Sequence, residues 1–237
     1  MTGGTSSDDH SEVGSGFIHF NFTPWGRRGD KATASLIGDV VHGLLLREPR
    51  IFLGGAGGLV GPGQVGFGSV TAAGQVIRKD IGPARLVSQA TPVFDVDFDR
   101  GRLDKVEKRS AANLRVIAEL VALRAWYRQV RLARVPPKPE TEHLSVIYEE
   151  GIRTLDGAIR ERLRQYQSFL AERGHTLPQL IPGNQLPCPL DIRPADPYID
   201  HLSWVRQLTD SDAVALVGWL ESSARAVVER SDVPEKP

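Results

Sequence analysis

Mostly hydrophobic residues recur every six positions in the glycine-rich part of the chain, over residues 51–81. A period of six is neither the two of a simple strand nor the 3.6 of a helix. It is typical of a parallel β-helix with triangular coils, in which each short strand points one side chain inward and a tight corner follows. Glycine suits such corners because it adopts positive φ and lets two backbones approach closely. The expected inward row is Leu53, Leu59, Val65, Thr71 and Ile77.

The same stretch contains a literal dinucleotide-binding motif. The segment 61–66, GPGQVG, matches G-x-G-x-x-G, and Asp80 lies about twenty residues on. A dinucleotide-binding fold needs a helix directly after these glycines. Here the chain continues as VTAAGQVIRKD, which is short, rich in strand-forming residues and interrupted by Gly74. The pattern therefore favours corners between short strands over a phosphate-binding loop.

From about Leu103 onward the apolar residues are spaced by three and four, as on the buried face of a helix. The proline-rich PPKP at 136–139 ends the first helix, and the next one could pack antiparallel to it as a hairpin. Thr209, with Asp212 three residues on, is a candidate N-cap for the last helix. The expected helices lie near 103–133, 142–173 and 209–230. The expected organisation is a disordered leader over 1–15, a β-helix over 16–98 and a helical extension over 99–237.

Composition narrows the function. The formal net charge is zero, from 29 basic and 29 acidic residues, so no global field favours nucleic acid or an anionic membrane as a partner. The single cysteine, Cys188, cannot form an internal disulfide, and no secretory leader or apolar run of about eighteen residues is present. We expect a cytoplasmic protein. No metal is expected either, because the six histidines include no closely spaced pair.

One segment departs from this charge balance. Ten lysines and arginines lie between Arg100 and Arg134, against three acids, and Arg124, Arg128 and Arg131 share a helix face. Such a face could attract a nucleotide or phosphosugar. Alternatively, it could be solvated or pair with acids of the following helix, such as Glu149, Glu150 and Glu161. Both interpretations stay open at the level of sequence.

The segments GGLVGPGQVGFGSVTAAGQVIRKDIG and IHFNFTPWGRRGDKATASLIGDV resemble a known family over about Phe17 to Gln89. They are similar to the last coils of the acetyltransferase domain of bifunctional UDP-N-acetylglucosamine pyrophosphorylase/glucosamine-1-phosphate acetyltransferases. The resemblance implies a short left-handed parallel β-helix of hexapeptide repeats, followed here by an α-helical C-terminal extension. It also implies a homotrimer that transfers an acetyl group from acetyl-CoA to an amino-sugar phosphate.

The resemblance also suggests site residues. Asn21 matches the side-chain amide that contacts the sugar or acetyl group, and Lys31 is the nearest match to a lysine that binds acetyl-CoA. The backbone of Ala72 and Ala73 matches the wall of the CoA cleft. His19 faces the same way as Asn21 on a strand, so it could serve as a general base in place of the family's histidine.

Other parts of the family pattern are missing. The G-H-x-x-Y-x-G-D motif with the catalytic histidine and the nucleotidyltransferase loop L-A-A-G-x-G-T-R-M are absent, so pyrophosphorylase activity is not expected. Gly55 and Ala90 stand where the family has a serine and an arginine that contact CoA. Two interpretations remain: an acetyltransferase-like enzyme, or a non-catalytic trimeric scaffold or subunit completed by a separately encoded partner.

Overall fold

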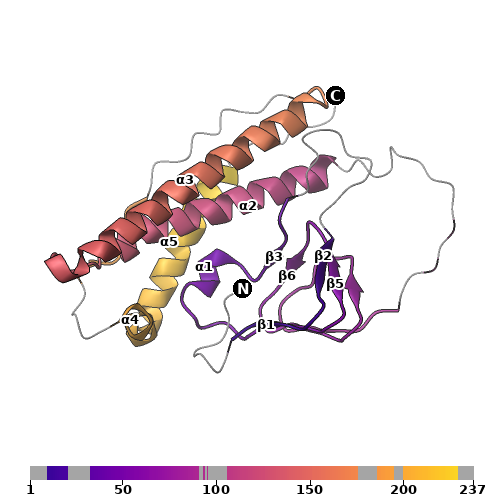
Figure 1. Ribbon diagram of the computed structural model, residues 1–237, viewed down its shortest axis with the longest axis horizontal. Coiled ribbons are helices and arrows are strands. Elements are labelled where there is room, and N and C mark those ends of the chain that lie inside the picture. The colour runs from indigo at the N-terminus through magenta and orange to yellow at the C-terminus, as the bar shows by residue number, and fades with distance from the viewer. Residues whose placement is uncertain are drawn as a thin grey trace. The chain divides into compact units, whose positions relative to one another are not determined.

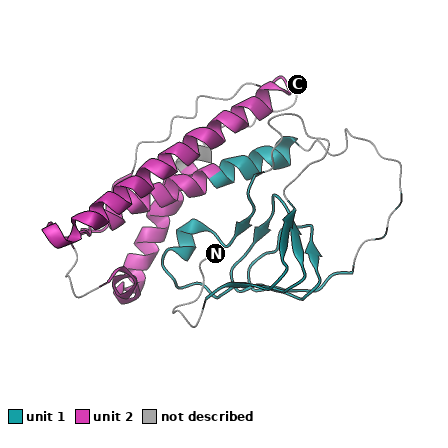
Figure 2. Cartoon of the chain, viewed as in Figure 1, with its two compact units in different colours: residues 1–116 teal, residues 117–237 magenta. Residues whose placement is uncertain are grey.

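The chain forms two compact units, residues 1–116 and 117–237 (Figure 2). The computed structural model describes residues 10–20, 33–90, 93, 95, 106–175, 186–194 and 200–228. Short strands occupy the first unit, and helices occupy the second (Figure 1). None of the helices in these described ranges is both long enough and apolar enough to cross a membrane.

The strands of unit 1 are only two or three residues long, and all their pairings are parallel. They form three separate sheets with the orders β1-β4-β7-β9, β2-β5-β8 and β3-β6. A short helix, α1, spans Val40–Gly43 and begins at Asp39, whose side chain accepts the backbone N–H of His42. The strands are β1 Glu12–Val13, β2 Ile18–Phe20, β3 Leu36–Ile37, β4 Phe52–Leu53, β5 Gly58–Val60, β6 Gln64–Val65, β7 Val70–Thr71, β8 Val76–Ile77 and β9 Leu86–Val87.

The predicted inward row is confirmed. All five of its side chains are buried, with at most 2% of their surface exposed. The four apolar side chains of the row share a core with Ile51, Phe67 and Ile81. Strand partners in β4–β7 and in β5–β8 lie eighteen residues apart, three of the six-residue intervals, as in the pair Phe52 and Val70. The period in the sequence therefore records which side chains are buried.

The predicted fold class, a left-handed parallel β-helix of hexapeptide repeats, is wrong. The strands do not join into one coiled or closed sheet, and helices hold about as much of the described chain as everything else together, so the fold is α/β. Each strand pairs only within its own small sheet because glycine-containing corners interrupt the ladder. At Gly54, for example, an added Cβ would lie 2.5 Å from the backbone of Ala72. A buried side chain at every sixth position is compatible with three small sheets, so this period does not by itself predict a continuous β-helix.

The helices of unit 2 form a hairpin followed by two further helices (Figure 1). α2, Val106–Trp126, starts in unit 1 and continues as a π-helical turn, η2, Tyr127–Arg131. A 3₁₀ turn, η3, Pro139–Thr141, leads into α3, Glu142–Ala171. α4 spans His201–Gln207, and α5 spans Asp210–Val228.

Residue contacts between the first two long helices run in opposite senses, which confirms the expected antiparallel hairpin. Arg124 bonds Asp156, while Arg131, further along, bonds Tyr148, which is earlier in α3. The predicted cap of the last helix is also confirmed, because the backbone N–H of Asp212 donates to the hydroxyl of Thr209 at 3.1 Å. The largest fully buried side chains of unit 2 are Ile117, Trp126, Val130, Ile159, Tyr166, Leu216 and Leu220.

Candidate functional site

A histidine and a serine meet on the accessible side of unit 1. His19 is the central residue of β2, and its Nε2 lies 2.7 Å from the hydroxyl of Ser35, which precedes β3. The same serine oxygen accepts the backbone N–H of Gly63 at 3.0 Å. The hydroxyl proton is therefore free to point at Nε2, provided that the imidazole is neutral with its proton on Nδ1. His19 is exposed and Ser35 is partly exposed, so a solute can reach the pair.

Gly61 makes room for this pair. A Cβ at Gly61 would lie 2.7 Å from Nε2 of His19 and 3.0 Å from the hydroxyl oxygen of Ser35. Both distances are shorter than ordinary van der Waals contacts, so any larger residue would push the imidazole or the hydroxyl aside. One glycine of the literal G-x-G-x-x-G string thus serves a close approach of side chains rather than a phosphate.

A pocket of about 90 Å³ lies within the same unit, and neither His19 nor Ser35 lines it. Ala34 and Leu36, on either side of Ser35, both line it. The carboxylate of Asp80 holds one wall in place by accepting the backbone N–H of Gln64 at 2.9 Å. The charged or polar lining residues are Gln64, Asp80, Lys108 and Arg115. The pocket therefore offers one negative and two positive groups to a small polar ligand.

The imidazole of His19 is suited to act as a general base. In the tautomer with its proton on Nδ1, Nε2 accepts a hydrogen bond from the Ser35 hydroxyl, so it is oriented to accept a proton at that position. A serine nucleophile would need a third group that orients the base. Among the described residues, none bonds Nδ1 of His19. Proton acceptance from a bound solute is therefore better supported than attack by Ser35.

The other predicted site residues divide into two groups. Asn21 and Lys31 lie outside the described residues. Ala72 and Ala73 follow β7, in a different sheet from His19. The backbone N–H of Ala72 donates to the carbonyl oxygen of Val87 at 2.9 Å, so it is not available to a pantetheine chain. Ala73 is exposed.

Sequence reasoning missed Ser35 and Gly61. Ser35 lies sixteen residues from His19 in the chain, and no alternation or motif joins the two. The sequence offered one indication, the glycine at position 61. A glycine can allow another group to approach the backbone closely, but it does not identify that group.

Two arginines of the basic segment noted in the sequence lie at one carboxylate of the next helix. Arg124 donates to Asp156 at 2.7 Å, and Arg128 lies 3.8 Å from the same carboxylate group. Two of the acids expected as partners bind arginines of their own helix instead. Glu150 bonds Arg153, and Glu161 bonds Arg164. Hydrogen bonds from Arg164, and then from Gln165, lower the pKa of Glu161 to about 2.

Cysteine and metal chemistry find little support in the described ranges. Burial raises the pKa of the Cys188 thiol, which disfavours the thiolate needed for nucleophilic attack. The backbone N–H of Cys188 donates to the side chain of Gln129 at 2.7 Å, which is a structural contact. In the part of the chain that the structure describes, no three His, Cys, Asp or Glu side chains gather closely enough to hold a metal ion.

Compared with models of known protein families and with curated protein sequences, the chain matches none of them. The resemblance to the sugar-nucleotide acetyltransferases therefore remains a prediction. The class of protein that the site defines is an α/β protein with an exposed histidine–serine pair beside a small charged pocket.

Proposed function

We propose that unit 1 transfers an acetyl group from acetyl-CoA to the amine of an amino-sugar phosphate, with His19 as general base. The observation that carries this proposal is the hydrogen bond between Nε2 of His19 and the hydroxyl of Ser35 beside a charged pocket. The resemblance around VTAAG supplies the donor and acceptor classes. We assign the reaction to the cytoplasm, since a chain with one cysteine suits a reducing compartment.

The chemistry requires one proton to move twice. The incoming amine displaces the Ser35 hydroxyl from Nε2 of His19, which takes a proton from the ammonium group. The neutral nitrogen attacks the thioester carbonyl carbon, and the C–S bond breaks. The proton on the imidazolium then goes to the departing CoA thiolate, and the nitrogen, which carries an extra proton after its attack, releases that second proton to water. The products are an amide, free CoA and one proton. Ser35 acts as a positioning residue, because it holds the imidazole ring in place when the acceptor is absent.

The charges of the pocket fit the proposed acceptor. Lys108 and Arg115 are suited to the phosphate group, and the carboxylate of Asp80 is suited to the ammonium group before it loses its proton. An acceptor with only one of these charges would leave part of the lining without a partner.

The decisive experiment measures CoA release from acetyl-CoA with glucosamine-1-phosphate. We expect His19→Gln to lower kcat/KM about 100-fold or more, as for loss of a general base. His10→Gln is the matched control, since His10 is an exposed histidine of the same unit. It is expected to retain full activity. Turnover that is absent in the wild type, or unchanged in His19→Gln, contradicts the proposal.

A second variant tests the geometry of the pair. Gly61→Ala places a methyl group against Nε2 of His19. Because the imidazole must move, we expect activity to fall by about tenfold while the thermal unfolding temperature changes little. Gly82→Ala is a control in the same unit, because an added Cβ there meets nothing within 4 Å. Equal activity of the two variants would remove Gly61 from the proposed site.

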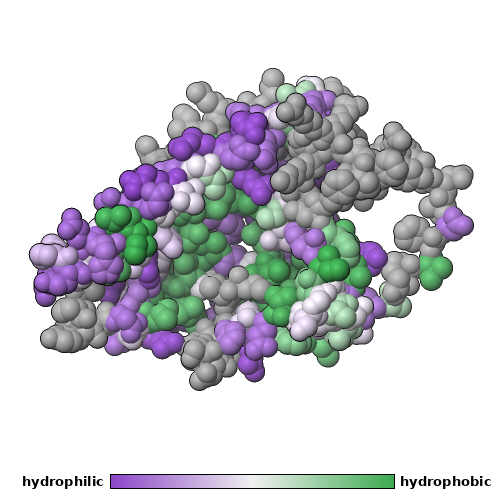
Figure 3. Space-filling view, viewed as in Figure 1, coloured by the Kyte–Doolittle hydropathy of each residue, from purple (hydrophilic) through white to green (hydrophobic). Residues whose placement is uncertain are grey.

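A non-catalytic assembly role is the second candidate, and exposed apolar residues in register favour it. Phe52, Val70 and Leu86 are aligned neighbours on β4, β7 and β9, and all three are exposed. Ile18 and Phe20 are exposed on β2. Figure 3 shows hydrophobic residues at the surface over the strands of unit 1. Such rows are normally covered by a partner.

We propose a homotrimer, as the resemblance implies, with these rows at the interface. The native mass of the purified chain tests this. A trimer that Leu86→Glu converts to monomers is the expected result, because a charge would be buried in the interface. A monomeric wild type overturns the homotrimer. Stable monomers that co-purify with the product of a neighbouring gene would favour the separately encoded partner instead.

A further inference from the structure

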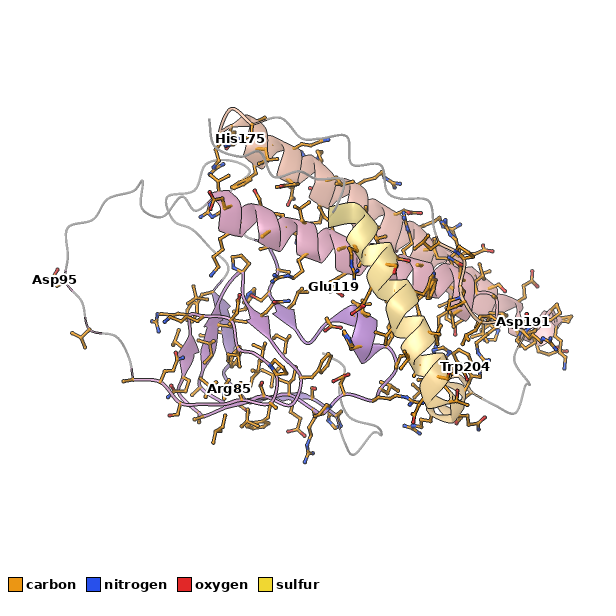
Figure 4. All side chains as sticks on the ribbon, turned by 180° about the vertical axis from the view of Figure 1, so that it is seen from behind. Arg85, Asp95, Glu119, His175, Asp191 and Trp204 are labelled. Carbon is orange, nitrogen blue, oxygen red and sulfur yellow. The ribbon has the colours of Figure 1, made fainter. Side chains whose placement is uncertain are left out.

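The strongest unexplained feature of unit 2 is a buried arginine that has no hydrogen-bond or carboxylate partner within the described ranges. Only 9% of the surface of Arg134 is exposed, and its guanidinium carbon lies 4.2 Å from the ring centroid of Trp204 in α4. Figure 4 labels Trp204. Among the described residues, none accepts a hydrogen bond from the Arg134 side chain or forms an ion pair with it. A buried charge in this state is costly, so a counterion from outside the described residues is expected to neutralise it.

The contrast with Arg124 shows what a structural arginine looks like in this unit. Arg124 is buried to a similar extent, but its guanidinium bonds the carboxylate of Asp156. Its Nε is fully enclosed and has no partner. No nitrogen of Arg134 belongs to the enclosed, unpartnered atoms of the described part, so its guanidinium group keeps an opening to the surface. The two arginines therefore differ in their partners: Arg124 bonds a carboxylate, and Arg134 bonds none among the described residues.

A second arginine adds positive charge beside Arg134. Arg131 lies three residues earlier in the chain, donates to the hydroxyl of Tyr148 at 2.6 Å, and has its guanidinium carbon 4.6 Å from that ring. Burial lowers the pKa of Arg134, and the charge of Arg131 lowers it further, which places the two cations near each other. A guanidinium group carries five N–H donors, so most of those on the two arginines remain available.

The surroundings are aromatic and contain little negative charge. His201 stacks at 5.7 Å from Trp204 and at 5.8 Å from Trp126, measured between ring centroids. Burial, and then the charges of Arg131 and Arg134, lower the pKa of His201 to about 3, so the imidazole is neutral near pH 7. Asp200 is the nearby acid, and its carboxylate already accepts the backbone N–H and the hydroxyl of Ser203 at the start of α4.

The backbone has an irregular turn at the same place. η2 is a π-helical turn that ends at Arg131, closed by the Leu132 N–H donating to the Tyr127 carbonyl oxygen at 2.9 Å. Single π-helical turns are frequent at functional sites because the extra residue redirects the following side chains. Here Val130 stays fully buried, while Arg131 and Arg134, which follow it, lie against aromatic rings.

We propose that Arg131 and Arg134 bind the phosphate group of a small phosphorylated metabolite, within the aromatic surround of Tyr148, His201 and Trp204. Two guanidinium groups match the double negative charge of a phosphomonoester, and their planar donor sets suit bidentate contacts with its oxygens. A carboxylate would neutralise only one of the two cations. The site lies wholly within unit 2 and does not depend on acyl transfer in unit 1.

Isothermal titration with inorganic phosphate, at constant ionic strength set with chloride, tests the site on the full chain. We expect saturable binding with one phosphate per chain. Arg131→Gln and Arg134→Gln are each expected to weaken it about tenfold or more, as for loss of a charged hydrogen bond. Arg153→Gln is the matched control, because Arg153 is an exposed arginine of α3 that pairs with Glu150. It is expected to bind phosphate as the wild type does.

Two further variants control for the loss of charge and for a failure to fold. Arg134→Lys keeps the charge but loses the planar donor set, so intermediate affinity is expected. Arg131 is only partly buried, so Arg131→Gln remains informative if Arg134→Gln fails to fold. Absence of saturation in the wild type overturns the proposal. Equal affinity in Arg131→Gln, Arg153→Gln and the wild type overturns it too, since the phosphate would then bind elsewhere.

Separate titrations distinguish the sources of the phosphate. A mononucleotide and a hexose phosphate represent small metabolites, and a short single-stranded oligonucleotide and anionic lipid vesicles represent macromolecular sources. For the oligonucleotide and the vesicles, the affinity is expressed per phosphate group. A mononucleotide or hexose phosphate that binds at least as tightly as this supports a metabolite site. Much tighter binding of the oligonucleotide or the vesicles, lost in Arg131→Gln, contradicts the metabolite assignment.

Discussion

Arg124 lies in α2 and Arg134 in the turn that follows η2, and 7% and 9% of their surfaces are exposed, yet their surroundings differ. Arg124 faces a carboxylate from the opposite helix, whereas Arg134 lies against the ring of Trp204. The basic residues of the segment 100–134 therefore do not all have the same role. This segment contains a cation that pairs within the helix hairpin and a cation that has no counterion in the described part of the chain. A buried cation that lacks a counterion indicates a ligand, whereas a paired one does not.

The largest expected effect comes from breaking the paired region. Asp156→Asn removes the charge opposite Arg124 and leaves a buried cation uncompensated. We expect the free energy of unfolding to fall by about 3 kcal/mol, at the low end for buried pairs because Asp156 is partly exposed. Urea unfolding followed by circular dichroism measures the change. Glu150→Gln, which breaks an exposed pair with Arg153, is the control and should cost about 0.5 kcal/mol or less.

A double variant sharpens the same point. Replacing both Arg124 and Asp156 by leucine leaves no buried charge, so most of the stability lost in Asp156→Asn should return. A double variant as unstable as Asp156→Asn would show that packing around the two side chains, rather than their charges, dominates this region.

The next effect in size depends on pH and concerns the unpaired region. The pKa of His201 is about 3 in the folded chain, below the ordinary value of 6.5. As the pH falls below 6.5, the unfolded chain binds a proton that the folded chain excludes. Stability from this residue is therefore complete above pH 6.5 and is lost as the pH falls towards 3. The slope is at most about 1.4 kcal/mol per pH unit.

Because the ring of His201 keeps some contact with water, we expect a loss of about 1 kcal/mol between pH 6.5 and pH 5. Urea unfolding of the wild type and of His201→Phe at both pH values measures it. The phenylalanine variant keeps an aromatic ring beside Trp126 and Trp204 but cannot titrate, so its stability should fall less. The same pH dependence in both proteins would mean that other groups carry it.

The two regions also differ in what sequence could predict. Helical periodicity located the hairpin, since the buried face of a helix needs apolar residues at intervals of three and four. It did not select Asp156 as the partner of Arg124, because the register of two antiparallel helices depends on side-chain packing that a charge count does not contain. Glu150 and Glu161 were equally good partners by sequence, but each binds an arginine of α3.

The strand unit shows the same limit. The inward row from Leu53 to Ile77 was predictable because buried positions must be largely apolar whichever sheet they join. The arrangement of the strands was not predictable, because a six-residue period is compatible with one continuous coil or with three small sheets. The pairing of His19 with Ser35 depends on a contact between two segments separated by residues 21–32, which no local pattern encodes.

The smallest expected effect is the most informative about Arg134. Arg134→Met loses the contact with Trp204 but also removes an unpaired buried charge, and the two changes oppose each other. We expect the free energy of unfolding to change by about 1 kcal/mol or less without phosphate. With saturating phosphate the wild type should gain stability, because the ligand binds only the folded chain, and Arg134→Met should gain less. Calorimetric unfolding with and without phosphate measures both. A cost as large as that of Asp156→Asn would mean that Arg134 is as structural as Arg124, and the distinction between the two arginines would be lost.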